Sequence, residues 1–238
     1  LLLVMAGTIG AGLVGARLAG QSIWSGLLAG GATAICGASA ALALFGVIGK
    51  DRLSQAQFAL TLVGISLASA AAMSTYPLLA AELGMNDQQA GFLIGASIHD
   101  VAQAIGGGYA FSDLAGNHAT IVKIARVALL APVVAMVGLI AEPPGQTTVS
   151  WWRRISLPWF IVAFIGVVAL NSLVAIPATM TAGALSGSKA LLLLAVTATA
   201  MRTRLDLLLA AGWRAAVPVM TATVTSLVIA ITCALWLI

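Results

Sequence analysis

The chain has 238 residues, of which 61% are hydrophobic and only 8% charged, and its net charge is +4. Soluble domains carry about 25% charged residues, so this composition excludes a water-soluble globular protein, and the small scattered charge is no nucleic-acid footprint. Uncharged apolar runs occur at 53–81, 155–188 and 215–238, and each reaches the length of about 20 residues that a bilayer requires. The sequence therefore predicts an all-α polytopic membrane protein.

Short polar connections divide the chain into hydrophobic segments, and we expect about eight transmembrane segments in one transporter domain, 1–238. The segments are 1–18, 22–48, 55–80, 88–111, 117–140, 157–179, 188–210 and 213–238. Leu1 already lies within a hydrophobic run. We therefore expect further N-terminal helices to precede this sequence.

Two of these segments contain residues that should interrupt a helix. The second has glycine and small polar residues at 30–39, and the seventh has charges at 197–206. Glycine weakens a helix by about 1 kcal/mol, and broken spans in corresponding halves indicate a transporter site. The second segment is the middle one of segments one to three, and the seventh is the middle one of segments six to eight. Because the two triplets have the same arrangement, we predict an inverted repeat. The end of the first repeat would be formed by residues 1–80, the central helices by residues 88–140, and the end of the second repeat by residues 157–238.

The fourth segment holds an ionisable patch, because His99 and Asp100 are its only acidic, basic or imidazole side chains. On a continuous helix, each of them would share a face with Gln103. Ionisable groups at membrane depth are costly and mark functional sites by default. We interpret the patch as a substrate-contacting or proton-coupling site. The alternatives are a polar helix-packing contact or a segment end that touches water.

A second candidate is the run Cys36-Gly37-Ala38-Ser39 inside the interrupted second segment. Small residues let a backbone unwind, and the positive N-terminus of a half-helix can bind an anion through its N–H groups. Cys36, Gly37 and Ser39 are therefore candidate substrate-binding residues. Close packing between helices is the alternative explanation.

Lys123 and Arg126 lie three residues apart in the fifth segment. They could neutralise an anionic substrate or pair with Asp100, whereas long basic side chains near a segment end often extend to the membrane surface instead. Arg202, Arg204 and Asp206 present the same choice in the seventh segment.

Motifs for enzymatic and metal chemistry are missing from the chain. It contains no GxxxxGK[ST] phosphate loop and no HExxH pair, and two histidines with two distant cysteines make a poor metal site. We therefore expect no cofactor, no metal and no enzymatic activity.

Several motifs resemble the YeiH-like family of bacterial inner-membrane proteins, whose label is sulfate exporter. They are AICGASA at 34–40, GASIHDVAQ at 95–103, and the stretches 119–127, 130–132, 158–160 and 171–173. The resemblance implies about ten helices, inverted repeats and two crossing discontinuous helices, as in sodium–proton antiporters and bile-acid-type symporters. The glycines at 106–108 depart from the family pattern, which has larger residues there.

Three functions are compatible with these features. The first is a secondary transporter that exports or exchanges a small inorganic or organic anion, such as sulfate, a related sulfur oxyanion or a sulfonate, by alternating access. The second is a cation–proton antiporter that uses Asp100, and the third is a non-transporting scaffold or intramembrane enzyme. The second segment has no carboxylate before Asp51, which favours an anion or a neutral substrate over a cation. The coupling ion, H⁺ or Na⁺, and a homodimeric state are left open, and membrane lipid is the expected surrounding.

Overall fold

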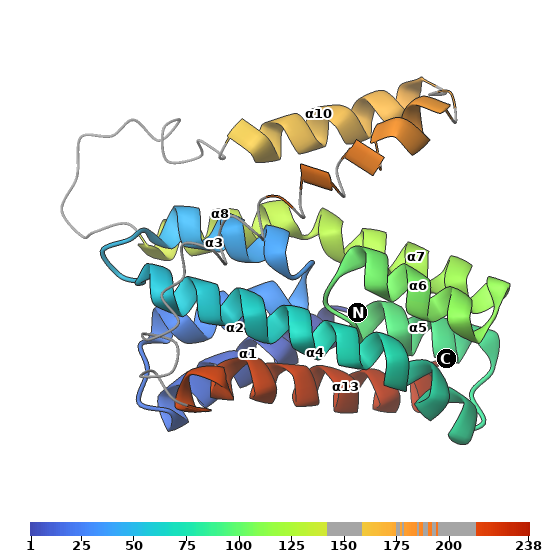
Figure 1. Cartoon of the computed structure of the whole chain (residues 1–238), viewed down its shortest axis with the longest axis horizontal. Helices are drawn as coiled ribbons and strands as arrows, with labels where there is room; N and C mark the ends of the chain where they lie inside the picture. Colours follow the sequence, from blue (N-terminus) through green and yellow to red (C-terminus); the bar gives the residue numbers. More distant parts are fainter. Residues whose placement is uncertain are drawn as a thin grey trace.

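The computed structural model describes residues 1–141, 159–174 and 213–238, together with short stretches between 177 and 194. Every regular element in these ranges is a helix (Figure 1). The α-helices are α1 (Leu2–Leu18), α2 (Ile23–Ala34), α3 (Ala38–Ile48), α4 (Gln55–Glu82), α5 (Asp87–Ser97), α6 (Val101–Phe111), α7 (Asp113–Ala128), α8 (Leu130–Ala141), α10 (Trp159–Leu173) and α13 (Val217–Leu237). A 3₁₀ turn, η1 (Trp213–Ala216), precedes α13.

Three helical stretches in the described part are long and apolar enough to cross a membrane. They are α4, α7 together with α8, and α13. Shorter apolar helices, including α1 and α3, accompany them. The prediction of an all-α membrane protein is confirmed, whereas the count of eight segments and the inverted repeat stay predictions.

The second predicted segment is discontinuous, as expected. α2 ends at Ala34 and α3 begins at Ala38, with Gly37 between them at φ +69° and ψ −119°. Side chains disfavour this backbone conformation, so a glycine is required there. Gly30 lies inside α2 instead, where a Cβ on Gly12 of α1 would be 2.5 Å from the Gly30 Cα. Only one of these glycines therefore makes the break, and the other lets two helices pack closely.

The fourth segment is also discontinuous, an interruption that was not predicted from the sequence. α5 ends at Ser97 and α6 begins at Val101, while Ile98 and Asp100 have extended backbone conformations. His99 therefore lies in a link between two half-helices and shares no helix face with Gln103. The other predicted interruption, 197–206, lies outside the described residues.

The fifth segment is interrupted at a single residue, Leu129, which separates α7 from α8. The Leu129 N–H bonds to the Arg126 carbonyl, one residue closer than in a regular α-helix. Pro132 follows, and because it has no N–H it cannot complete the regular hydrogen-bond ladder. The Ala128 carbonyl therefore lacks its regular helical donor.

Helix packing brings the two links together in the interior. α1 packs against α2 and α13, and α5 packs against α6, α7 and α13. The glycines at 106–108 take part in this packing, since a Cβ on Gly108 would lie 2.8 Å from the Ala119 Cβ. A Cβ on Gly37 would lie 3.7 Å from the His99 carbonyl carbon and 3.8 Å from the Asp100 nitrogen. We call the two adjacent links, 35–37 and 98–100, the crossing.

Candidate functional site

Lys123 of α7 joins the two links of the crossing. Its side chain is fully buried, and its Nζ donates hydrogen bonds to the carbonyl oxygens of Ile35 at 3.0 Å and Ile98 at 2.8 Å. A third bond goes to the carbonyl of His99. The alternative that Lys123 extends to the membrane surface is therefore wrong.

Arg126, one turn further along α7, binds the last turns of the two preceding half-helices. Nη2 donates to the Thr33 carbonyl and Nε to the Ala34 carbonyl, each at 2.8 Å. Nη1 donates to the carbonyls of Gly95 and Ile98, each at 2.9 Å. Carbonyls at a helix C-terminus have no partner within the helix and favour a cation. Arg126 therefore ties the C-termini of α2 and α5 together.

Asp100 is half-buried and begins α6. Its Oδ1 accepts a hydrogen bond from the Gln103 backbone N–H at 3.0 Å, and its own N–H donates to Ser69 Oγ of α4 at 3.0 Å. In a capping box, the side chain of the third helical residue would bind the N–H of the capping residue. Ser69 takes that place, and the buried Gln103 Oε1 has no hydrogen-bond partner. Both basic side chains bind backbone carbonyls, and neither pairs with Asp100.

His99 is fully buried and connects the crossing to α13. Its Nε2 lies 2.9 Å from Thr223 Oγ1, whereas its Nδ1 has no hydrogen-bond partner. The hydroxyl of Thr33 near the end of α2 is likewise buried without a partner. Buried polar atoms are rarely left unpaired in native proteins. Three such atoms, on Thr33, His99 and Gln103, belong to residues in or next to the crossing.

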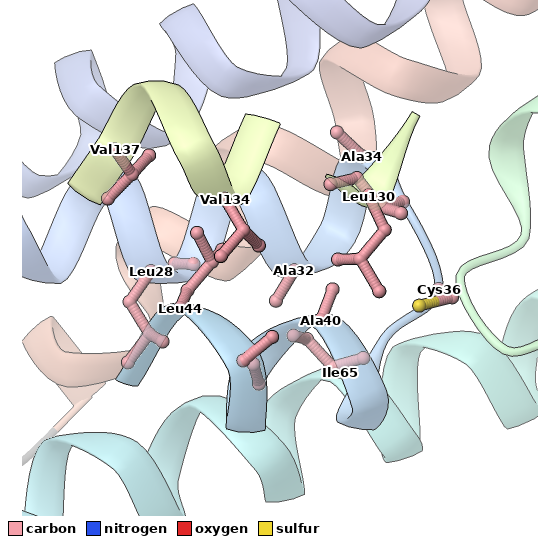
Figure 2. Close-up of a cluster of buried hydrophobic side chains, with 14 of the residues drawn as sticks. Leu28, Ala32, Ala34, Cys36, Ala40, Leu44, Ile65, Leu130, Val134 and Val137 are labelled. Carbon is pink, nitrogen blue, oxygen red and sulfur yellow. The ribbon is translucent and has the colours of Figure 1, made fainter. Parts of the chain in front are cut away.

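The N-terminus of α3 has no capping side chain, because Gly37 occupies the cap position. The first N–H groups of a helix have no partner inside it. Ser39 is exposed in this first turn. Cys36 lies in the link, and its side chain belongs to a buried apolar cluster formed mainly by α2, α3, α4 and α8 (Figure 2).

The charges at the crossing leave an excess positive charge. Lys123 and Arg126 are both buried, and Asp100 is the single carboxylate among the residues whose contacts are given above. Two helix N-termini and two helix C-termini meet there, so their partial charges offset each other. Buried charge is stable only when it is paired or hydrogen-bonded, and both cations meet that need through backbone carbonyls rather than through a carboxylate. No group of histidine, cysteine and acidic side chains suited to a metal occurs in the part that the structure describes.

The structure adds three polar residues that the sequence did not single out: Thr33, Ser69 and Thr223. Thr33 lies in the run of small residues at 30–39, whereas nothing in the local sequence distinguishes Ser69 and Thr223 from other hydroxyl residues in apolar helices. The break at 98–100 did carry a signal, because Asp100 followed three residues later by Gln103 is a capping pattern. That pattern predicts a helix start at Val101.

Comparison with known proteins identifies relatives of this chain. A family model described as "Conserved hypothetical protein 698" matches residues 1–219. A UPF0324 membrane protein of Chlorobaculum tepidum is 39% identical over 87% of this chain and 58% of its own length. A UPF0324 membrane protein of Rhizobium meliloti is 39% identical over 89% of this chain and 62% of its own length. The UPF0324 membrane protein TauZ of Paracoccus denitrificans is 36% identical over 84% of this chain and 60% of its own length.

The chain thus spans about 60% of the length of these curated relatives. No solved structure matches it.

Proposed function

Because this chain belongs to the family of conserved hypothetical protein 698, which includes the UPF0324 membrane proteins, we propose that it is a secondary membrane transporter for a small anion. The family membership confirms the resemblance to the YeiH-like proteins. The named relatives are bacterial membrane proteins, and the described helices include three that can span a bilayer. The chain is accordingly a bacterial multi-pass membrane protein.

The observation that carries the anion proposal is the pair of fully buried cations, Lys123 and Arg126, with Asp100 as the one carboxylate among the described residues of the crossing. An anion at the crossing would balance the excess charge. It would find the uncapped N-terminus of α3 on one side and the unpartnered polar atoms of His99 and Gln103 on the other. Helix N-termini of discontinuous spans bind anionic substrate groups in several transporter folds.

The proposed substrate class is a sulfur oxyanion, such as sulfate, or a sulfonate. These ions present several acceptor oxygens around one centre, which suits N–H donors that converge from different elements. Cys36, Gly37, Ser39, His99, Asp100 and Gln103 are the proposed surroundings of the substrate. Lys123 and Arg126 would act on it through their charge, because their hydrogen bonds are directed to backbone carbonyls. Transport would proceed by alternating access, with the crossing open to one side at a time.

The second candidate, a cation–proton antiporter centred on Asp100, has less support. The Asp100 carboxylate already accepts the Gln103 N–H as the cap of α6, and the nearby carbonyls bind side-chain cations. A non-transporting membrane protein would be stabilised by none of the small ions.

Thermal unfolding of the purified full-length protein with a ligand panel tests the proposal. Sulfate, thiosulfate, taurine, chloride, acetate and Na⁺ would each be titrated at constant ionic strength. A ligand at 100 times its dissociation constant adds about 2.7 kcal/mol to the native state. We expect a saturable rise in melting temperature with a sulfur oxyanion or sulfonate. Stabilisation by Na⁺ alone would favour the antiporter, and a response to no ligand would contradict transport.

Gln103→Met provides the sharpest variant for this test. The Gln103 Oε1 makes no hydrogen bond, so the substitution should leave the melting temperature of the unliganded protein nearly unchanged. It should nevertheless remove the stabilisation by the anion. Gln88→Met is the matched control, because Gln88 is exposed at the start of α5. Full retention of anion binding in Gln103→Met would exclude this amide from the site.

A further inference from the structure

The Lys123 side chain ends in a cage of backbone carbonyls that is suited to a free cation. Its Nζ contacts Ile35 O of the first link at 3.0 Å and Ile98 O of the second at 2.8 Å, together with His99 O. A carbonyl oxygen can only accept, so three of them require three N–H donors on one nitrogen. Only a protonated lysine has three such donors. The three carbonyls therefore form a site that fits an ammonium ion.

Carbonyls freed by the unwinding of discontinuous helices are the groups that coordinate Na⁺ in many secondary transporters. In this chain the corresponding oxygens come from both links, and they converge on a nitrogen that the chain itself supplies from α7. Arg126 occupies the next carbonyls on both sides. Three further carbonyl oxygens, those of Thr33, Ala34 and Gly95, are therefore also occupied by a side chain.

We propose that Lys123 is a tethered cation that occupies the position of a coupling alkali ion, so that this site neither binds nor requires Na⁺. The part that concerns transport rests on the function proposed above, and the part that concerns the cage does not. The exchange conserves charge, because a monovalent ion would replace one ammonium. The total charge of the crossing, to which Arg126 and Asp100 also contribute, would therefore be the same with a bound ion as with Lys123.

The test removes the ammonium and supplies a free ion in its place. Lys123→Met keeps an unbranched side chain without charge, and Lys50→Met is the matched control at an exposed lysine. Melting temperatures of the full chain would be measured in choline chloride, NaCl and KCl at equal ionic strength. We expect the wild type and Lys50→Met to be insensitive to the choice of cation. Lys123→Met should melt lower in choline and rise by about 3–6 °C at ten times the dissociation constant of the ion.

Each outcome decides the proposal. A Lys123→Met protein that is folded and insensitive to both Na⁺ and K⁺ would overturn it, as would one that cannot be purified folded in either salt. A variant that is folded only in NaCl or KCl would support it. Saturable stabilisation of the wild type by Na⁺ or K⁺ would also overturn it, because a free ion would then bind although Lys123 is present.

A transport measurement separates this inference from the proposed function. Wild-type protein in liposomes should move the anion found in the ligand panel equally well in Na⁺ and in choline. Uptake that requires Na⁺ would contradict the tethered cation. Absence of any anion transport would contradict the proposed function alone, since the melting experiment on Lys123→Met would still report on the carbonyl cage.

Discussion

The two half-helices that follow the breaks, α3 and α6, begin with different residues. At the α2–α3 break, Gly37 has a positive φ and leaves the N-terminus of α3 without a side-chain cap. At the α5–α6 break, Asp100 has an ordinary extended backbone and caps α6 with its own carboxylate. One positive helix end is thus open and the other already holds a negative group. Under the proposed function, a substrate anion would lie closer to α3 than to α6.

The two half-helices that precede the breaks, α2 and α5, in contrast end with similar hydrogen bonds to the same two side chains. Lys123 bonds to the carbonyls of Ile35 and Ile98, which hold similar positions just after α2 and α5. Arg126 bonds to carbonyls at the ends of both helices. One helix therefore holds both breaks in place, and the asymmetry that bears on function is confined to the two N-termini.

The largest expected effect comes from Arg126→Met, which removes the support common to both breaks. Four hydrogen bonds to buried carbonyls are lost, so we expect a destabilisation of about 3–5 kcal/mol, as when one partner of a buried charged network is removed. Denaturant or thermal unfolding measures it. Arg17→Met, at an exposed arginine, should stay within about 0.5 kcal/mol. Equal stability of the two variants would contradict the role given to Arg126.

Gly37→Ala perturbs the first break alone. A side chain at its φ of +69° is strained, and the new Cβ would lie 3.3 Å from Ile65 Cγ2. We expect a loss of about 1–3 kcal/mol in the free energy of unfolding. Gly46→Ala is the control, since Gly46 lies inside α3 with open space around it, and there alanine should stabilise by about 0.5–1 kcal/mol. A stabilising Gly37→Ala would show that the break does not need this conformation.

Asp100→Ala perturbs the second break, and its effect should be smaller. Loss of an N-cap side chain costs about 1 kcal/mol, and asparagine caps nearly as well as aspartate. Asp100→Asn should therefore unfold at nearly the wild-type temperature. If the carboxylate takes part in the transport cycle, uptake of the anion into liposomes should still be abolished. Normal uptake by Asp100→Asn would limit Asp100 to its structural role as a cap.

Thr223→Val should give the smallest change in stability, because it removes only the contact between α13 and His99 Nε2. Side-chain hydrogen bonds between membrane helices average about 0.6 kcal/mol. Thr232→Val serves as the control, since Thr232 is exposed and bonds only within its own helix. A loss of unfolding free energy several times larger would contradict this expectation. It would mean that the other contacts of the crossing depend on the orientation that Thr223 gives to the His99 imidazole.

The break at 35–37 was predicted from the sequence, whereas the break at 98–100 was not. Gly37 lies in a run of small residues, which is a local signal for an interrupted helix. His99 and Asp100 lie in an apolar run with no proline and no glycine between 96 and 105, so the spacing of the polar patch was interpreted on a helix and the break was not predicted. The cap pattern of Asp100 and Gln103 was present, but it does not reveal that Ser69, 31 residues away, replaces the reciprocal bond.

Membrane insertion follows from the sequence by itself, because the preference for lipid is a sum over residues that needs no knowledge of their contacts. The candidate residues His99, Asp100 and Gln103 were also found without a structure, since polar groups are costly anywhere in an apolar segment. Only the tertiary structure decided what Lys123 and Arg126 do. Lys123 binds a carbonyl 88 residues away and Arg126 one 93 residues away. Which carbonyls are free to accept a cation depends on where two distant helices break and how closely they pack, and no local pattern encodes that.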